Sequence, residues 1–440
     1  MDEEAVSDFR RDGAAAVEWV ADYLEGVREL RVFSRSRPGE IRAALPASPP
    51  ETGEPFEDVL RDLDSVLLPG ITHWNHPRFF GYFAISGSEP GILAELLVAG
   101  LNVNAMLWRT SPAATELEEL ALDWLRQLLG LPEGLHGHIE DTASTATIAA
   151  LAAARELRPG GSVLTSAEAN FVVERAARLL GLECRRIPVD GEFRLRPDVL
   201  AAEIDGATVV VATAGTTSTT SVDPVPEISE LCERTGVWLH VDAAYGGAAA
   251  VCEEFRWVLE GCERADSVVV NPHKWLFTPI DCSCLWTRRP EAFVRAFGME
   301  AAYMPERSAV TDLKDYGPAL GRRFRALKLW AVLRCFGRQG LQQLIREHVR
   351  LAQLFASWVE QEPGWEIAAP HPLSTVCFRR TGSDGENEAV LQRVNASGEA
   401  FLTHTYLDGR FVLHLAVGNL RTTEDDVRRA WELLREAAAA

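Results

Sequence analysis

Lysine is the scarcest charged residue in this sequence. Of its 44 Lys and Arg residues only Lys274, Lys314 and Lys328 are lysines, so chemistry that needs a lysine amine has three candidates. Long apolar runs are missing too. No stretch approaches the roughly 18 apolar residues of a membrane span, and residues 1–30 are acidic and amphipathic, unlike a signal peptide. We therefore expect no membrane partner and a cytoplasmic location.

Clustered positive charge is also missing. Proteins use such clusters to bind nucleic acids and anionic membranes. The 440 residues carry a formal net charge of −20, which argues against a nucleic-acid partner. With 47% hydrophobic and 25% charged residues, the composition is that of a globular protein with two or three domains and a large core.

Metal-ligand spacing is absent among the cysteines and histidines. The eight cysteines are scattered, and the closest pair, Cys282 and Cys284, lies in an apolar run that indicates a strand. We expect reduced, mostly buried thiols. The histidine pairs His73/His76 and His136/His138 have no carboxylate or cysteine near them at the spacing of metal ligands. We therefore expect no metal site.

Three regions follow one another along the chain. The first region, 1–85, is predicted to be a helical dimerisation arm, and it shows helical spacing to about residue 68 around a Pro-rich connector at 37–55. This segment could hardly form a core alone, so we expect it to pack on the main domain or on a second subunit. Residues 86–331 are predicted to form a large domain, and residues 332–440 a small α+β domain.

The large domain shows a βαβ rhythm. Amphipathic stretches near 144–157, 168–181, 196–204 and 226–235 separate the earlier members of a set of short apolar runs. This pattern predicts an α/β fold with a mainly parallel, buried sheet whose ligand site lies at the carboxyl ends of the strands. The predicted strands are 162–165, 183–188, 208–213, 237–241, 267–270 and 282–287.

The last hundred residues predict a long helix, short strands and a closing helix. The long helix is expected over 326–336 and 341–359, and the strands over 376–379 and 411–415. Thr422 or Thr423 precedes three acidic residues, the pattern of a helix N-cap followed by side chains that favour the helix dipole.

Lys274 is the best of the three lysines for chemistry. It directly follows the buried strand 267–270 and lies between His273 and Trp275. Desolvation there can lower the pKa of the amine and allow it to act as a Schiff-base nucleophile. Lys314 in a polar loop and Lys328 among arginines are expected to be surface residues.

Two further elements complement Lys274. Asp242 leaves the strand 237–241, and a buried carboxylate needs a cation or a hydrogen-bond donor, which a protonated pyridine nitrogen would supply. Small hydroxyl residues at 142–147 precede a helical run, where free N–H groups and the helix dipole favour a phosphate. Proteins that bind pyridoxal phosphate combine a lysine, an acid and a phosphate site in this way.

The motifs that carry a resemblance span most of the chain. They are THWNHP at 72–77, SPAATELE at 111–118, VDAAY at 241–245, NPHKW at 271–275, DCS at 281–283 and LGRRFR at 320–325. The set resembles the group II pyridoxal-phosphate-dependent amino acid decarboxylases, enzymes of fold type I, with the aromatic L-amino acid branch as the nearest. The resemblance implies a carboxy-lyase that works as a homodimer with shared active sites.

The resemblance also implies roles for single residues. Lys274 becomes the Schiff-base lysine, Asp242 the partner of the pyridine nitrogen, and Tyr303, in a lid over 298–314, the acid that returns a proton after CO₂ leaves. Implied cofactor contacts are Ala143, Ser144, Asn170, Thr217, Asn271, His273 and, from the second subunit, Gly321. Implied substrate contacts are Trp74, Tyr82 and Ile85, with Asn104 and Met106 from the neighbouring subunit, and they favour aromatic or bulky apolar substrates.

Three departures from the family pattern concern the site. The pocket differs, because Tyr-Phe-Ala-Ile at 82–85 stands where the family usually continues Pro-Thr, and Asn104 and Met106 stand where the aromatic branch has larger apolar or aromatic residues. Asn170 stands where the aromatic decarboxylases place a histidine stacked on the cofactor ring, and this resembles relatives that decarboxylate and oxidatively deaminate to an aldehyde. His414 stands where relatives often show arginine, so no carboxylate-binding role is assigned to it. Alternatives to a decarboxylase are an aldehyde synthase, an aminotransferase or another lyase of the same fold, and a non-catalytic scaffold.

Overall fold

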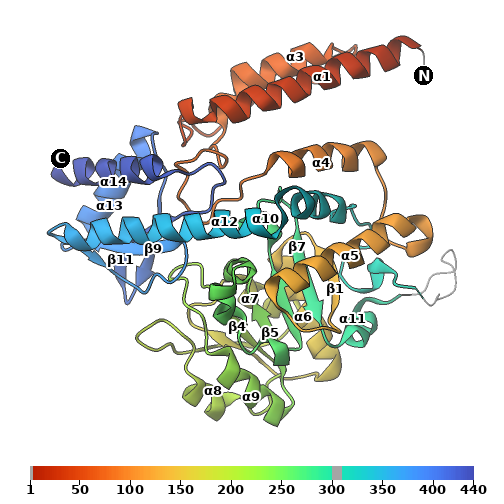
Figure 1. Cartoon of the computed structure of the whole chain (residues 1–440), viewed down its shortest axis with the longest axis vertical. Coiled ribbons are helices and arrows are strands. Elements are labelled where there is room, and N and C mark those ends of the chain that lie inside the picture. The colour runs from red at the N-terminus through yellow and green to blue at the C-terminus, as the bar shows by residue number, and fades with distance from the viewer. Residues whose placement is uncertain (1–2, 300–309) are drawn as a thin grey trace.

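Seven strands form the central sheet of the computed structural model, which describes residues 3–299 and 310–440 (Figure 1). Their order is β1-β7-β6-β5-β4-β2-β3, and only β7 runs antiparallel to its neighbours. The predicted mainly parallel α/β class and all six predicted strands are confirmed, whereas β1 was not predicted. The strands are β1 (His136–Glu140), β2 (Val163–Ser166), β3 (Cys184–Ile187), β4 (Val209–Thr213), β5 (Trp238–Asp242), β6 (Ser267–Val270) and β7 (Ser283–Thr287).

Helices cover both faces of this sheet. In β4, Val209 and Val211 pack into the core on one face, and Val210 and Ala212 into the core on the other. Alternate side chains are therefore buried on both sides, which is why the strand reads as a continuous apolar run. One face carries α6 (Ala143–Leu157), α7 (Val172–Leu179) and α11 (Pro290–Phe297); the other carries α5 (Pro112–Leu129), α8 (Pro197–Glu203) and α9 (Val225–Thr235).

A second, antiparallel sheet forms the small domain, with the order β10-β11-β9-β8. The closing helix is confirmed, and Thr423 is its N-cap. β8, β10 and the polar helix α13 were not predicted. The elements are β8 (Trp365–Ile367), β9 (Thr375–Arg380), α13 (Asp384–Ser397), β10 (Thr403–Leu407), β11 (Arg410–Ala416) and α14 (Glu424–Ala439).

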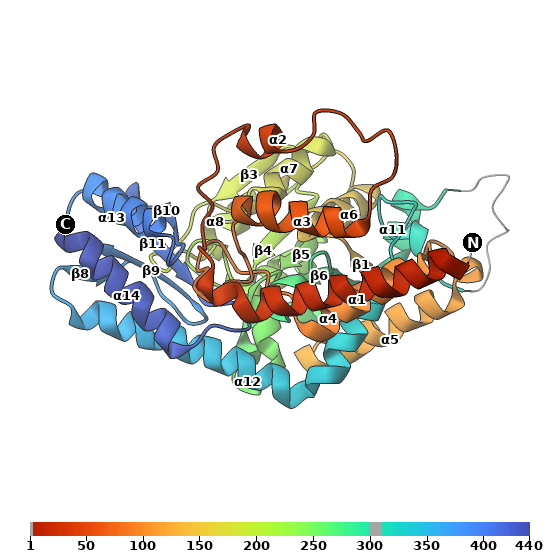
Figure 2. The same cartoon turned by 90° about the horizontal axis from the view of Figure 1, so that it is seen from above.

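The long helix α12 (Ala326–Gln361) runs from the large domain to the small one (Figure 2). It is bent at Gly337, whose φ of 61° and ψ of −179° are not helical. Glycine takes this left-handed φ without the steric cost that a side chain imposes. The bend separates the two helical stretches that the sequence predicted. The boundary predicted between residues 331 and 332 falls within α12, and the three predicted domain limits stay predictions.

The N-terminal helices lie at one end of the molecule, beyond α4 and away from the central sheet (Figure 1). The Trp19 indole N–H donates to the Asp64 carboxylate at 2.7 Å, and the Val32 N–H donates to the Gly398 carbonyl at 2.8 Å. Each helix in the described ranges is too short or too polar to cross a bilayer. The N-terminal helices are α1 (Glu3–Gly26), α2 (Glu40–Ala44) and α3 (Phe56–Asp62), and α4 (Glu89–Leu101) follows them.

Neither of the two lysines predicted at the surface is fully exposed, so that prediction was wrong: Lys328 is buried and Lys314 is half-buried, each in an ion pair. Lys328 is fully buried, pairs with Glu95 of α4, and lies 3.9 Å from the Asp281 carboxylate. The side chain of Lys314 is 10% exposed and pairs with Asp315. Because Glu95 lies 233 positions before Lys328, no local pattern in the sequence indicates this pair.

Replacing Lys328 by methionine is expected to lower the free energy of unfolding by about 3 kcal/mol, because the Glu95 and Asp281 carboxylates lose the fully buried one of their cationic partners. Urea denaturation at pH 7 measures the change. Arg323→Met is the matched control, since Arg323 binds the same Glu95 at 2.6 Å but is half exposed. It should cost less than about 1 kcal/mol, and equal losses in the two variants would contradict the assignment.

Candidate active site

The carboxyl ends of β4, β5 and β6 meet around a cavity of about 260 Å³. Parallel strands bring their carboxyl ends to one edge of the sheet, where the loops that follow them can form a binding site. Eight residues that the sequence singled out line this cavity: Ala143, Ser144, Asn170, Thr217, Asp242, Asn271, His273 and Lys274.

Lys274 enters the cavity from the short helix α10 (Pro272–Trp275), which directly follows β6. Its backbone N–H donates to the Asn271 carbonyl at 2.9 Å. Burial lowers the pKa of the Lys274 amine from its usual value, and the Asp242 carboxylate opposes that shift. A lowered pKa increases the neutral, nucleophilic fraction of the amine.

Asp242 ends β5 and is 7% exposed. One carboxylate oxygen accepts the Ala244 N–H at 3.0 Å. Within residues 3–299 and 310–440, no lysine, arginine or histidine nitrogen lies within ion-pair distance of this carboxylate. Burying an acid without a cation is costly, so the carboxylate can stabilise a positively charged group of a ligand.

The N-terminus of α6 forms another wall through Thr142, Ala143 and Ser144. The Asp141 carboxylate accepts the Thr142 N–H at 2.5 Å and the Thr142 hydroxyl at 3.1 Å, which fixes the entry into the helix. The next N–H groups have no acceptor within the helix itself. Together with the helix dipole they favour an anion such as phosphate.

Asn271 and His273 form a buried polar cluster beside Lys274. The Ser283 hydroxyl donates to Asn271 Oδ1 at 2.6 Å, and the Asn271 amide nitrogen lies 3.3 Å from His273 Nε2. The Cys282 N–H donates to His273 Nδ1 at 2.9 Å. Burial, assisted by the charge of Lys274, lowers the pKa of His273 to about 3, so the ring is neutral at physiological pH.

Asn170 is held on both sides of its amide. Its Nδ2 donates to Thr217 Oγ1 at 3.1 Å, and its Oδ1 accepts the Val172 N–H at 3.0 Å. The second bond caps the start of α7. The amide therefore links α7 to the loop that follows β4, and its orientation is fixed.

Three predicted residues lie together outside the cavity. Asn104 Oδ1 accepts the Arg322 N–H at 3.0 Å, and Asn104 Nδ2 lies 3.5 Å from Met106 Sδ. Gly321 precedes Arg322, and Asn104 Nδ2 is the atom nearest to the position of a Cβ there. Asn104, Met106 and Gly321 thus form one surface group that does not reach the cavity of the described chain.

The predicted substrate residues of the N-terminal region also lie outside the cavity lining. Trp74 and Tyr82 stack with ring centroids 5.8 Å apart, Tyr82 is 55% exposed, and Ile85 is half-buried. The neighbouring Phe83 packs on Tyr245, which does line the cavity, so this aromatic group borders the site. Tyr303 lies outside the described residues.

The sequence did not single out three further lining residues. Tyr245 stacks on Trp275 at 5.2 Å and accepts the Ser374 N–H at 3.1 Å, which ties the cavity to the small domain. Thr213 ends β4, and its buried hydroxyl has no hydrogen-bond partner in the described part of the chain. Phe171 is 60% exposed. The sequence signal that could have identified Thr213 as a lining residue is its position at the end of a predicted strand.

The whole chain resembles known decarboxylases. Residues 38–159 and 160–381 match the pyridoxal-dependent decarboxylase conserved domain. The chain belongs to this family of pyridoxal-dependent decarboxylases. It is 41% identical to the aromatic-L-amino-acid decarboxylase of Sus scrofa, covering 98% of this chain and 96% of that protein. It is 37% identical to the phenylacetaldehyde synthase of Arabidopsis thaliana, covering 100% and 97%.

A solved structure extends the likeness to the fold. Oryza sativa TDC, crystallised with PLP and tryptamine, superimposes with a TM-score of 0.97 at 35% identity, covering 100% of this chain and 99% of that one. The chain is thus a pyridoxal-phosphate-dependent amino acid decarboxylase of fold type I, as predicted.

The donor set of the cavity fits pyridoxal phosphate. Asp242 is a buried acid without an ion-pair partner among residues 3–299 and 310–440, and Lys274 offers an amine of lowered pKa. The N-terminus of α6 can accept the phosphate, and the Thr213 hydroxyl, which no described residue bonds, leaves hydrogen-bonding capacity for a polar ligand. Each polar part of the cofactor thus has a suitable group on the cavity wall.

Proposed function

We propose that this enzyme decarboxylates an aromatic L-amino acid to the corresponding amine and CO₂. The observation that carries the proposal is the single cavity in which Lys274, Asp242 and the N-terminus of α6 converge. The 41% identity to an aromatic-L-amino-acid decarboxylase supports the substrate class.

In this proposal the residues that line the cavity have different roles. The bound cofactor withdraws electrons from the substrate α-carbon so that the carboxylate can leave as CO₂. Lys274 would hold the cofactor through its amine at the aldehyde carbon, and Asp242 would favour the protonated form of the ring nitrogen. The remaining cavity residues orient the phosphate and the ring, namely Ala143, Ser144, Asn170, Thr217, Asn271 and His273.

Aromatic side chains beside the cavity support an aromatic substrate. Trp74 and Tyr82 stack with their planes 12° apart, and Phe79 and Phe401 extend this group. Aromatic rings favour one another in offset or edge-on contact. In this proposal Trp74, Tyr82 and Ile85 bind the substrate side chain. The acid that returns the proton is Tyr303, a role that rests on the sequence resemblance.

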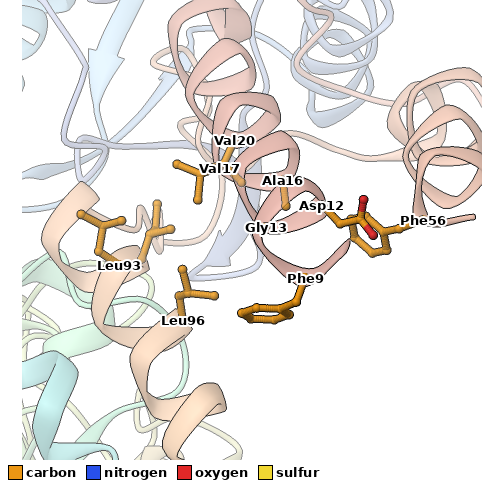
Figure 3. A pocket seen from close by; sticks show the side chains of 10 residues that line it. Phe9, Asp12, Gly13, Ala16, Val17, Val20, Phe56, Leu93 and Leu96 are labelled. Carbon is orange, nitrogen blue, oxygen red and sulfur yellow. The ribbon is translucent and has the colours of Figure 1, made fainter. Parts of the chain in front are cut away.

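A homodimer with shared sites completes the proposal. An apolar groove of about 420 Å³ lies between α1, α3 and α4. Figure 3 shows Phe9, Val17 and Val20 of α1 on the side that faces Leu93 and Leu96 of α4. Phe9 is 73% exposed and Leu96 53%, and contiguous apolar surface of this kind marks an interface. A second copy of the chain is the occupant that we propose.

The group formed by Asn104, Met106 and Gly321 supports the same assembly. These residues cluster away from the cavity of their own chain, although the family resemblance assigns all three to a binding site. Contribution to the cavity of the partner explains both facts.

A cytoplasmic location is also proposed, and the eight cysteines, all free and six of them buried, support it.

Replacing Leu96 by aspartate is expected to convert the dimer to a monomer, because a charge would lie in the middle of the apolar groove. Sedimentation velocity measures the change, and activity should fall at least about tenfold because the partner's residues leave the site. Leu179→Asp on α7 is the control, since Leu179 is also exposed but lies outside the groove. A Leu96→Asp variant that remains dimeric would refute the interface.

Asn170 favours a second candidate function, the decarboxylating oxidation of the substrate to an aldehyde. In this reaction dioxygen and water are consumed, and CO₂, ammonia and hydrogen peroxide leave with the aldehyde. The fixed amide of Asn170 provides no aromatic ring to cover the cofactor, and one relative is a phenylacetaldehyde synthase.

Replacing Asn170 by histidine is expected to lower the share of aldehyde in the product several-fold while CO₂ release persists. The physical reason is that an imidazole ring covers the cofactor face that the amide leaves open to dioxygen. Chromatography of amine and aldehyde, with a peroxide assay, measures the ratio. Asn170→Gln, which keeps an amide, should behave like wild type. A wild-type enzyme that makes only amine, in step with CO₂, rules out the aldehyde function.

A panel of the natural L-amino acids, scored together for CO₂, amine and aldehyde, tests the proposed function. The expected result is CO₂ release from tryptophan, tyrosine, phenylalanine or dihydroxyphenylalanine. Transfer of the amino group to a 2-oxo acid without CO₂ would indicate an aminotransferase instead. A protein that binds no cofactor and converts no substrate would be a non-catalytic scaffold.

A further inference from the structure

A row of side chains on the small sheet faces the loop that carries Thr217. Thr403 of β10 is paired with His414 of β11, and His414 is paired with Cys377 of β9. Side chains at paired positions lie on the same face of a sheet. Three side chains on this face contact the loop after β4: His414 bonds the Thr217 carbonyl, Cys377 Sγ donates to the Ser218 carbonyl at 2.7 Å, and Thr405, on the same face as Thr403, bonds the Ser218 hydroxyl at 3.0 Å.

His414 is the centre of this row and is bonded at both ring nitrogens. Its Nε2 lies 3.1 Å from the Thr217 carbonyl, and its Nδ1 lies 3.3 Å from Thr403 Oγ1. A carbonyl only accepts, so Nε2 carries the proton and Nδ1 accepts from the Thr403 hydroxyl. The ring is 4% exposed, and burial lowers its pKa to about 4.

The two ends of this hydrogen-bond chain reach opposite parts of the site. At one end Thr217 lines the cofactor cavity and accepts from Asn170. At the other end Thr403 Oγ1 accepts the Tyr82 N–H at 3.1 Å. Tyr82 has a φ of 52°, a left-handed conformation that is strained for a residue with a side chain and needs support from its surroundings.

We propose that His414 is a positioning residue that holds the cofactor-side loop at Thr217 and the substrate-side backbone at Tyr82 in fixed relation. This inference rests on the proposed function, which places Tyr82 beside the substrate. Only a neutral imidazole provides one donor and one acceptor on opposite sides of a rigid ring, and both are used here. An arginine at this position could not accept from Thr403.

Three variants test separately the two ends of the hydrogen-bond chain through His414. His414→Leu removes both bonds, and His414→Gln keeps an amide that can donate to the Thr217 carbonyl. Thr403→Val removes the hydroxyl that joins His414 to Tyr82 and leaves the Thr217 bond in place. His404→Leu is the control, because His404 is exposed on the opposite face of β10. The readouts are the Kd of pyridoxal phosphate for the apoprotein, KM, kcat and the unfolding temperature.

His414→Leu is expected to raise the cofactor Kd and KM about tenfold each, because a buried carbonyl and the support of Tyr82 are lost. His414→Gln should keep the cofactor Kd within about threefold of wild type. Thr403→Val should raise KM about fivefold with the cofactor Kd within twofold. His404→Leu should change neither constant by more than about twofold, as for surface substitutions in general.

Two outcomes overturn the proposal. One is equal cofactor binding in wild type and His414→Leu, with only the unfolding temperature lowered. The other is a Thr403→Val variant whose cofactor Kd rises as much as its KM. Because cofactor titration needs no substrate, the bond between His414 and Thr217 is tested even if the wild type releases no CO₂. Failure of the proposed function is therefore distinguishable from failure of this inference.

Discussion

Replacing Lys274 by arginine is expected to abolish decarboxylation, with a loss of at least about 10⁴-fold in kcat. A guanidinium keeps the positive charge but stays protonated and cannot attach covalently to the cofactor aldehyde carbon. The absorption band of the lysine-bound cofactor should disappear together with the activity. Absorption spectra and CO₂ release from the same preparation measure both effects.

The scarcity of lysine makes the control for this experiment simple. Lys314→Arg keeps the ion pair with Asp315 and should leave both readouts within about twofold of wild type. A Lys274→Arg variant that retains the absorption band, or that releases CO₂ at a tenth of the wild-type rate, would show that another amine holds the cofactor.

Asp242→Asn is expected to lower kcat roughly 150- to 5,000-fold, because removal of one partner from a buried charge pair costs about 3–5 kcal/mol. The asparagine can still accept the Ala244 N–H, so the backbone is undisturbed. Covalent attachment at Lys274 does not need the carboxylate, and the absorption band should persist. Steady-state kinetics and a spectrum of the variant separate these two effects.

Asp242→Glu provides the matched comparison, since it keeps the charge but moves it by one methylene. Its kcat should lie between those of wild type and Asp242→Asn, because misplacement of a catalytic charge is less harmful than its removal. An Asp242→Asn variant within tenfold of wild type would mean that the carboxylate does not face the ring nitrogen.

The central sheet could be predicted because its strands are buried on both faces. The run from Val209 to Val211 is apolar and β-branched at every position, and the adjacent strands β2 and β5 are likewise buried at every position. Strand β1 contains His136, Gly137 and His138 and lies at the sheet edge, so its sequence lacks that signal. Helix α13 is polar and was missed, although Ser383 and Glu386 form the capping box of its first turn.

Most of the cofactor side of the site could be predicted because it depends on local sequence. Lys274 and Asp242 follow predicted strands directly, and Ala143 begins a predicted helix. The pairing of Lys328 with Glu95 depends on contacts between segments far apart in the chain, which no local pattern reports. The same holds for His414, whose bond to Thr217 joins the two domains across 197 positions.

Residues of both sheets therefore position the site. The large sheet places Lys274 and Asp242 at the ends of adjacent strands, and the small sheet contacts the loop at Thr217 through His414. Tyr245 adds a second link between the domains through Ser374. We expect changes in the small sheet to affect cofactor binding although they lie outside the cavity.

Borohydride reduction of the cofactor-loaded enzyme, followed by peptide mass mapping, tests the central claim most directly. The chain offers three lysines, each in a different sequence context, so the modified residue can be identified without ambiguity. We expect one reduced pyridoxyl phosphate group per chain, on Lys274. A group on Lys314 or Lys328, or no covalent group at all, would contradict this claim.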